Sequence, residues 1–340
     1  MSFSRCRSAV VLAFALALAL PARADPVTIR ADWNITPGQF APLIPTAPQY
    51  APDLYRHYGK SYVVEPLHMQ GGGATLTALA VGETDLSTLS PQALVLGVVN
   101  AKLDLRVIAQ QLSTEIPGYL QTYFWVRAGE IKTIEDLKGK TIGVSVRGSN
   151  VSSAAEMVMA KHGFTEGKDY QLLEIAFPSQ YAALQERRID AAVLVTPFHL
   201  RALGNPAVQP IFSVGDAFGP VETLMWIAKA DYVAKNRAAL VDMLEDNMRY
   251  RRWMLDPKTR MDAVKQLSDV TKLPVDAYAS WVYTTGDYYY EPHAMVDIAR
   301  LQRNVETMKE TGIVPAAIDV RPHVDMSLAQ EAAARLDKEK

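Results

Sequence analysis

Short apolar stretches rich in β-branched residues alternate with longer segments of helical period along the first two thirds of the chain. The short stretches are typical of buried strands, and the 3.6-residue repeat is typical of helices with one buried face. The pattern predicts strands at Val27–Trp33, Tyr62–Leu67, Leu105–Ala109, Thr141–Val146, Gln171–Ile175 and Ala191–Val195. It predicts helices between them at Ala74–Val81, Pro91–Ala101, Val151–His162 and Gln180–Arg188. This alternation favours α/β layers with a largely parallel sheet.

The pattern changes after about Asp231, where helical periodicity takes over. Helices are predicted at Ala238–Leu255, Lys258–Val270 and Ala294–Thr311. The tail after Ser327 predicts a solvated helix or a frayed end. We therefore expect a helical C-terminal third packed on an α/β body.

Two segments about a hundred residues apart have the same order of predicted elements. In each, a helix is followed by a tight turn with Asp, a short strand, and a hydroxyl residue before proline. They span residues 79–91 and 184–197 and end in Ser90-Pro91 and Thr196-Pro197. The repeat predicts two lobes of similar build.

The first 24 residues have the pattern of a secretory signal peptide. Arg5 and Arg7 precede an entirely apolar run, Ala9–Leu20, and the segment closes with Ala22-Arg23-Ala24. A basic start, a short apolar core and an A-x-A exit predict cleavage after Ala24 and a periplasmic location. The alternative is a membrane anchor, but the run is shorter than the roughly 20 residues that span a bilayer.

Cysteine and charge narrow the classes of function. The single cysteine, Cys6, lies inside the predicted signal peptide, so the rest of the chain would have no disulfide and no thiol nucleophile. Without the three arginines of that segment, 32 basic residues stand against 37 acidic ones, a net charge of −5. No basic block is present, which argues against nucleic acid or an anionic membrane as a partner.

Loops at the ends of strands hold the candidate ligand-binding residues. In open α/β sheets, ligands bind beyond the carboxyl ends of strands, where helix starts offer free N–H groups and partial positive charge. Glycines let a ligand approach the backbone, and Arg147 is the nearest fixed cation, so these loops suit a carboxylate, a sulfonate or a similar anion. The candidates are Trp33, Asn34, Gly73, Ala74, Thr75, Ser90, Arg147, Gly148, Ser149, Asn150 and Thr196.

Each candidate also has a plain structural explanation. The glycine triplet can be a tight turn, and Ser149 or Asn150 can be a helix cap. Arg147 can be a surface residue and Trp33 a core aromatic. The ligand-binding interpretation depends on all of these loops lying at equivalent strand ends.

Signs of catalysis or metal binding are few. The six histidines are scattered, with no pair at the i, i+4 spacing of a helical metal site, and no G-x-S-x-G motif is present. The glycines are not followed by Gly-Lys-Ser or Gly-Lys-Thr, so they do not form an ATP loop. His68 is expected in the core, and Tyr288-Tyr289-Tyr290 is expected to pack under the C-terminal helices. We expect no catalytic residue, cofactor or metal.

Five segments spread over nearly the whole chain after residue 24 carry a family resemblance. They are Gly72–Ala74, Ala80–Leu86, Ile134–Val144, Ile189–Val193 and Glu310–Val314. With them the chain resembles the substrate-binding components of ABC importers for nitrate, sulfonates and taurine, a group that includes the thiamine-precursor binders. The most specific of the five is the I-x-D-L-K-G-K-x-I-G-V stretch at residues 134–144.

The resemblance implies a two-lobed periplasmic binding protein type II fold with two crossing segments and the ligand closed between the lobes. Lobe 1 would comprise residues 25–113 and 216–340, and lobe 2 residues 114–215. The family's cleft loops fall on the candidates already named and add Phe177. The implied partners are a small-molecule ligand, here a small organic anion, and an ABC permease in the inner membrane. The sequence gives no sign of oligomerisation, so we expect a monomer.

Other interpretations stay open. A periplasmic enzyme on the same fold, such as a cyclic-acid dehydratase, would need an acid–base pair that the loops do not display. A sensor lobe of a membrane receptor would bind a ligand in the same way without a permease. Asp32-Trp33 is similar to the thiamine-precursor branch and so leaves a pyrimidine ligand open, but Asn34-Ile35 replaces the Pro-Asn expected next. The segment from Pro37 to Pro52 is rich in proline where relatives begin a regular helix.

Overall fold

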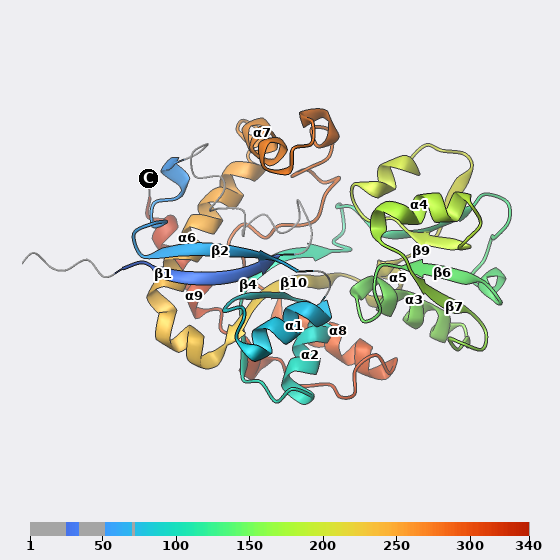
Figure 1. Ribbon diagram of the computed structural model, residues 1–340, viewed down its shortest axis with the longest axis horizontal. Helices are drawn as coiled ribbons and strands as arrows, with labels where there is room; N and C mark the ends of the chain where they lie inside the picture. The colour runs from blue at the N-terminus through green and yellow to red at the C-terminus, as the bar shows by residue number, and fades with distance from the viewer. Residues whose placement is uncertain (1–24, 34–51, 70–71, 340) are drawn as a thin grey trace, which may run out of the picture.

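The computed structural model describes residues 25–33, 52–69 and 72–339. They form two lobes, each built around a mixed sheet with helices on its faces, with lobe 1 on the left of Figure 1 and lobe 2 on the right. The chain crosses between the sheets twice, through residues 115–122 and 214–220. The predicted two-lobed α/β fold with two crossing segments is therefore confirmed. The residue boundaries of the lobes stay a prediction, and the predicted signal peptide lies outside the described residues.

Lobe 1 contains a sheet in the order β2-β1-β3-β10-β4. β1 and β2 pair in parallel, and a parallel bridge between Ala31 and Leu86 continues the sheet to β3. β10 runs antiparallel to both of its neighbours, β3 and β4, so the carboxyl ends of the other four strands share one edge. The strands are β1 (Val27–Trp33), β2 (Tyr62–His68), β3 (Ser87–Leu89), β4 (Leu105–Thr114) and β10 (Val221–Lys229).

Lobe 2 repeats this sheet in the order β7-β6-β8-β5-β9. β6 pairs in parallel with β7 and β8, and β5 takes the antiparallel place that β10 has in lobe 1. The strands are β5 (Tyr123–Arg127), β6 (Thr141–Val144), β7 (Gln171–Glu174), β8 (Ala191–Val193) and β9 (Val208–Ser213). β3 and β8 are equivalent, as the repeat in the sequence predicts, so Ser90-Pro91 and Thr196-Pro197 leave equivalent strands.

Helices cover both faces of the lobe 1 sheet, as alternate residues of β10 show. Met225 and Ile227 join a buried cluster with α1, α2 and α8, whereas Trp226 and Ala228 join a second cluster with α6 and α9. The helices of the lobe are α1 (Gly72–Val81), α2 (Pro91–Val99), α6 (Ala230–Leu255), α7 (Arg260–Thr271), α8 (Ile298–Glu310) and α9 (Ser327–Leu336). Lobe 2 has α3 (Asn150–Lys161) and α4 (Phe177–Gln185), and α5 (Val214–Phe218) lies in the second crossing segment. Short 3₁₀ helices lie at Pro52–Leu54, Glu135–Leu137, Phe198–Arg201, Val275–Ala277 and Arg321–His323.

The structure corrects three expectations. The tail after Ser327 is neither solvated nor frayed, because Leu328, Ala332 and Leu336 of α9 are buried in the cluster with α6. β5, β9 and β10 are additional strands, and α6 begins at Ala230 with a kink at Asn236, two residues before the predicted start at Ala238. His68 is exposed, not in the core. No helix of the described ranges has the length and apolar character to cross a membrane.

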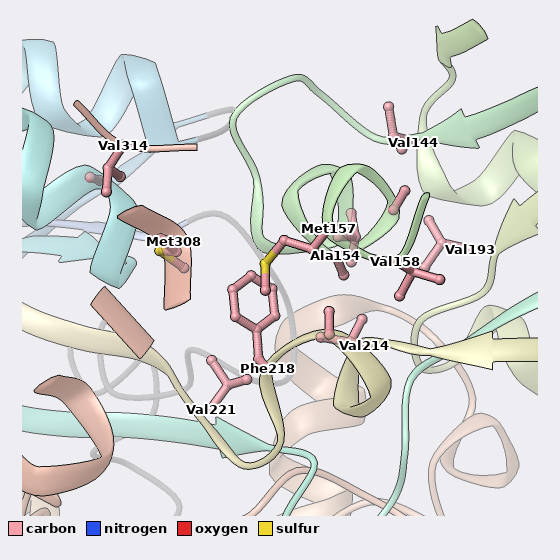
Figure 2. Close-up of a cluster of buried hydrophobic side chains, with 14 of the residues drawn as sticks. Val144, Ala154, Met157, Val158, Val193, Val214, Phe218, Val221, Met308 and Val314 are labelled. Carbon is pink, nitrogen blue, oxygen red and sulfur yellow. The ribbon is translucent and has the colours of Figure 1, made fainter. Parts of the chain in front are cut away.

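One apolar cluster runs from lobe 2 into lobe 1 through the second crossing segment. Figure 2 shows Met157 of α3 next to Phe218, which is followed by Val221 at the start of β10. Met308 of α8 belongs to the same cluster on the lobe 1 side. The second crossing segment is therefore packed into the core and is not a free linker.

Candidate functional site

The lobe 1 side of the candidate site is made by the starts of α1 and α2. Gly73 and Ala74 are exposed in the first turn of α1, whereas Thr75 is fully buried. A Cβ placed on Gly73 would meet no atom within 4 Å, so the space in front of this helix start is open. Ser90 caps α2 by accepting a hydrogen bond from the Ala93 N–H at 3.2 Å. Two helix N-termini thus lie at the carboxyl edge of the sheet, where free N–H groups favour an anion.

Trp33 ends β1 beside these helix starts. Its ring packs on the imidazole of His68 at the end of β2, with ring centroids 4.5 Å apart. Trp33 is half-buried, so part of its ring is available to a ligand. Asn34, the next candidate, lies outside the described residues.

The lobe 2 side is made by the start of α3. Ser149 caps this helix by accepting from the Ser152 N–H at 3.3 Å, and its own hydroxyl donates to the Val146 carbonyl at 2.8 Å. Gly148 precedes the cap with a φ of +76°, a conformation that favours glycine. Both bonds of Ser149 stay inside lobe 2, so its hydroxyl is a helix cap, the plainer of the two expectations.

Side chains of the two lobes meet between α2 and α3. Gln92, in the first turn of α2, accepts a hydrogen bond from the Ser153 hydroxyl of α3 at 3.4 Å. The Asn150 amide donates to the Thr223 carbonyl of β10, also at 3.4 Å. Gln92 was not among the residues expected from the sequence. One signal could have identified it, because it is the single polar side chain in the otherwise apolar segment Pro91–Val99.

Arg147, the expected cation for an anionic ligand, turns toward its own lobe. Its guanidinium lies 2.6 Å from a Glu166 carboxylate oxygen and donates to the Leu172 carbonyl at 3.2 Å. Its backbone N–H donates to Glu174 at 2.9 Å. The side chain is half exposed, at 50%, so these contacts can exchange with solvent or with a ligand. In the described structure, however, Arg147 holds the loop in front of α3.

Thr196 lies between the lobes, whereas the last candidate, Phe177, stays on lobe 2. Thr196 is buried near the phenol of Tyr288 from the C-terminal part of lobe 1, and its hydroxyl has no hydrogen-bond partner within the described residues. Phe177 begins α4 and is half-buried against the main apolar cluster. Within the described ranges, Trp33, Gly73, Ala74 and Phe177 make no hydrogen bond or ion pair to the opposite lobe.

Two buried acids lie next to these loops. Asp32, the residue before Trp33 in β1, accepts the Thr88 N–H with one carboxylate oxygen at 2.8 Å, and burial raises the pKa of this carboxyl to about 6. Glu115 begins the first crossing segment and accepts the Thr122 N–H at 3.0 Å. Burial raises the pKa of Glu115 to about 7, with a smaller contribution from Asp216. A carboxyl with a raised pKa is less fully ionised near neutral pH than an exposed one, and it repels an anionic ligand correspondingly less.

A small hollow beside the crossing segments contains an arginine, but this cation is also paired. The hollow has a volume of about 200 Å³ and is lined in part by Glu222, Tyr289 and Arg300. Arg300 lies 2.7 Å from Glu222 and 3.2 Å from Asp297. Its positive charge is therefore paired with acidic residues of lobe 1.

One group of side chains in the described part of the chain has metal-ligand composition. It consists of His57, Asp242 and Glu245, with ligand atoms within 4.8 Å of one another. Two arginines already neutralise the carboxylates, Arg249 at 2.6 Å from Glu245 and Arg335 at 2.9 Å from Asp242. A metal ion would have to displace these cations, so the group fits an ion-pair network that ties α6 to the segment before β2.

A comparison with models of protein families shows to which family this chain belongs. The model of the NMT1-like family matches residues 35–268. The chain belongs to the NMT1-like family. The match spans both crossing segments and the loops in front of α1, α2, α3 and α4. No curated protein matches this NMT1-like protein in sequence.

Solved structures similar to this NMT1-like protein share its fold. The aliphatic sulphonate binding protein SsuA from Escherichia coli superposes with a TM-score of 0.63 at 20% identity, covering 88% of this chain and 92% of that one. The alkanesulfonate-binding protein SsuA from Xanthomonas axonopodis pv. citri, bound to MOPS, gives 0.66 at 18%, with coverages of 89% and 99%. The nitrate-binding protein NrtA from Synechocystis PCC 6803 gives 0.66 at 17%, with coverages of 92% and 89%. The NMT1-like protein thus has the periplasmic binding protein fold.

Proposed function

We propose that this protein binds a small organic molecule between its lobes in the periplasm and delivers it to an ABC permease. The observation that carries the proposal is the meeting of the α2 and α3 starts, where Gln92 and Ser153 connect lobes built on the same sheet. Such an arrangement encloses a ligand by hinge closure at the two crossing segments. The predicted signal peptide, residues 1–24, agrees with a periplasmic location, and we propose a monomer.

The ligand class that we propose is a small organic anion, a sulfonate or a carboxylate. The open N-terminus of α1 at Gly73 and the start of α3 at Asn150 supply N–H donors for the acidic group. Trp33 and Phe177 supply apolar surface for the body of the ligand. Arg147 would have to leave Glu166 to add a direct ion pair. The sulfonate and nitrate binders among the structural neighbours agree with this class.

The other interpretations gain no support from the geometry. Asp32 and Glu115 are buried and bonded to backbone N–H groups, so neither forms an open acid–base pair of the kind that a dehydratase needs. Asn34-Ile35, on which a pyrimidine ligand depends, lies at residues that the structure does not describe.

A thermal-shift screen of residues 25–340 tests the function. We would use sulfonates, nitrate, aromatic carboxylates and pyrimidines. A compound at 100 times its dissociation constant should add about 2.7 kcal/mol, a rise of several degrees in Tm. A rise with sulfonates or carboxylates supports the proposal, and a rise with pyrimidines alone contradicts the ligand class.

A matched pair of variants on α1 locates the site. Gly73→Glu puts a negative side chain at the open helix start, where it should occupy the place of the acidic group and remove the shift. Val81→Glu puts the same side chain at the other end of α1, where Val81 is 66% exposed, and should keep the shift. Equal shifts in both variants would show that the anion binds elsewhere.

A further inference from the structure

Gln92 is buried at the place where the lobes touch. It is 7% exposed although it carries a polar amide, and its partner Ser153 is 1% exposed. A buried amide without a partner costs free energy, so this contact favours the arrangement in which the lobes are together. When the lobes separate, water has to replace the hydrogen bond.

The backbone of lobe 2 is shaped to receive this amide. A Cβ on Gly148 would stand 3.7 Å from Gln92 Nε2 and 3.9 Å from Oε1, so Gln92 packs directly on the turn in front of α3. A longer side chain at position 148 would occupy the place of the amide. The same turn leads into Ser149 and Asn150, the start of α3 at the proposed site.

The neighbouring serine of α3 has a different role. The Ser152 hydroxyl donates to the Ser149 carbonyl at 3.0 Å, inside lobe 2, whereas the Ser153 hydroxyl donates to Gln92 in lobe 1. Both serines are buried, at 0% and 1% exposure. The hydroxyls of the two adjacent serines thus differ in whether their hydrogen bond crosses between the lobes.

We infer that Gln92 is a positioning residue that helps to hold the lobes closed before a ligand arrives, through Ser153 and the turn at Gly148. This inference deepens the proposed function, and its consequence for ligand affinity rests on that function. A protein that is already closed for part of the time binds its ligand more tightly, because apparent affinity scales with the fraction in the competent state. Gln92 therefore sets the affinity without being required to touch the ligand.

The distance between the lobes tests this inference without any added compound. Spin labels are placed at Ala101→Cys after α2 and Lys168→Cys after α3, both exposed positions, in a full chain in which Cys6, the single cysteine, is replaced by Ser. Wild type should show a main population at the short distance of the closed form. Gln92→Ala and Ser153→Ala should each raise the open-to-closed ratio about fivefold, the effect of losing one neutral hydrogen bond.

Ser152→Ala serves as the control and should match wild type, because the bond of the Ser152 hydroxyl is internal to lobe 2. The inference is overturned if Gln92→Ala and Ser153→Ala keep the wild-type distances, if Ser152→Ala opens the lobes as much, or if wild type is already open. Circular dichroism confirms that each variant is folded. Failure of the compound screen would reject the proposed function and leave this result unaffected.

Discussion

Lobe 1 and lobe 2 have the same sheet but differ in what surrounds it. In lobe 1, β3 leads into the nine-residue helix α2, whereas in lobe 2 the equivalent β8 leads into the short 3₁₀ helix Phe198–Arg201. Lobe 1 also carries α6 to α9, which lobe 2 lacks in its described residues. The shared sheet places loops at equivalent edges, but the length and polarity of each loop decide what it can bind or hold.

The largest expected effect tests whether the lobes are independent units. Phe124 of β5 is fully buried, and its ring stacks on that of Phe212 with centroids 4.3 Å apart. Trp226 lies on β10, the equivalent antiparallel strand of lobe 1, and is 1% exposed. Replacing either by Ala should cost about 3–5 kcal/mol. Because the apolar cluster is continuous through Phe218, we expect calorimetry to show one transition that both variants lower. Two transitions, each sensitive to one variant, would mean that the lobes unfold separately.

The next largest effect is the pH dependence of stability that comes from Glu115 in the first crossing segment. The pKa of Glu115 is about 7 in the folded protein and ordinarily 4.5, so the unfolded chain loses this proton first as pH rises. Glu115 therefore lowers stability progressively between about pH 4.5 and 7, by about 3 kcal/mol at most. Glu115→Gln should flatten the pH dependence of the free energy of unfolding, measured by urea at pH 5 and pH 8. An equal decline in both proteins would contradict the buried state of this carboxyl.

A smaller effect is expected at the start of α3 in lobe 2. If an anion binds there, Arg147→Ala should weaken it by roughly tenfold, the effect of losing one charged partner. Glu166→Gln removes the competing carboxylate that now holds Arg147, and should raise affinity severalfold. Calorimetric titration with the best compound of the screen measures both. Unchanged affinity in Arg147→Ala would mean that the anion site is misplaced.

The smallest effects compare the two helix caps. Ser90→Ala in lobe 1 and Ser149→Ala in lobe 2 should each lower stability by about 1 kcal/mol, because each removes the acceptor of a first-turn N–H. Thermal unfolding measures both variants under one buffer condition. A loss of affinity with no change in Tm would indicate instead that the hydroxyl contacts the ligand.

The strand pattern predicted much of this fold because parallel strands buried on both faces leave continuous apolar runs in the sequence. β1 was predicted at the residues that form it, and the repeat ending at Ser90 and Thr196 predicted two similar sheets. β5, β9 and β10 were not predicted, although β5 and β10 are rich in the aromatic and β-branched residues that favour strands. Their pairing partners lie far away in the chain, so the local pattern does not place them in a sheet.

The candidate site was less predictable than the sheet. Sequence position gives the edge of the sheet on which a loop lies, but the direction of a side chain depends on partners that are distant in sequence. Arg147 turns to Glu166, 19 residues further on, and Gln92 turns to Ser153, 61 residues further on. Neither partner is indicated by the local pattern around the two residues.

The place of β5 and β10 in the chain has a consequence for the order of folding. In lobe 2 the antiparallel strand β5 comes first, so every strand of that sheet belongs to one continuous stretch, Tyr123–Ser213. In lobe 1 the corresponding strand β10 comes last, and β3 and β4 have no partner between them until residues 221–229 have been synthesised. Pairing over such separations is slow. A chain that emerges from its N-terminus would thus complete its second lobe before its first, leaving an unfinished sheet edge in lobe 1 meanwhile.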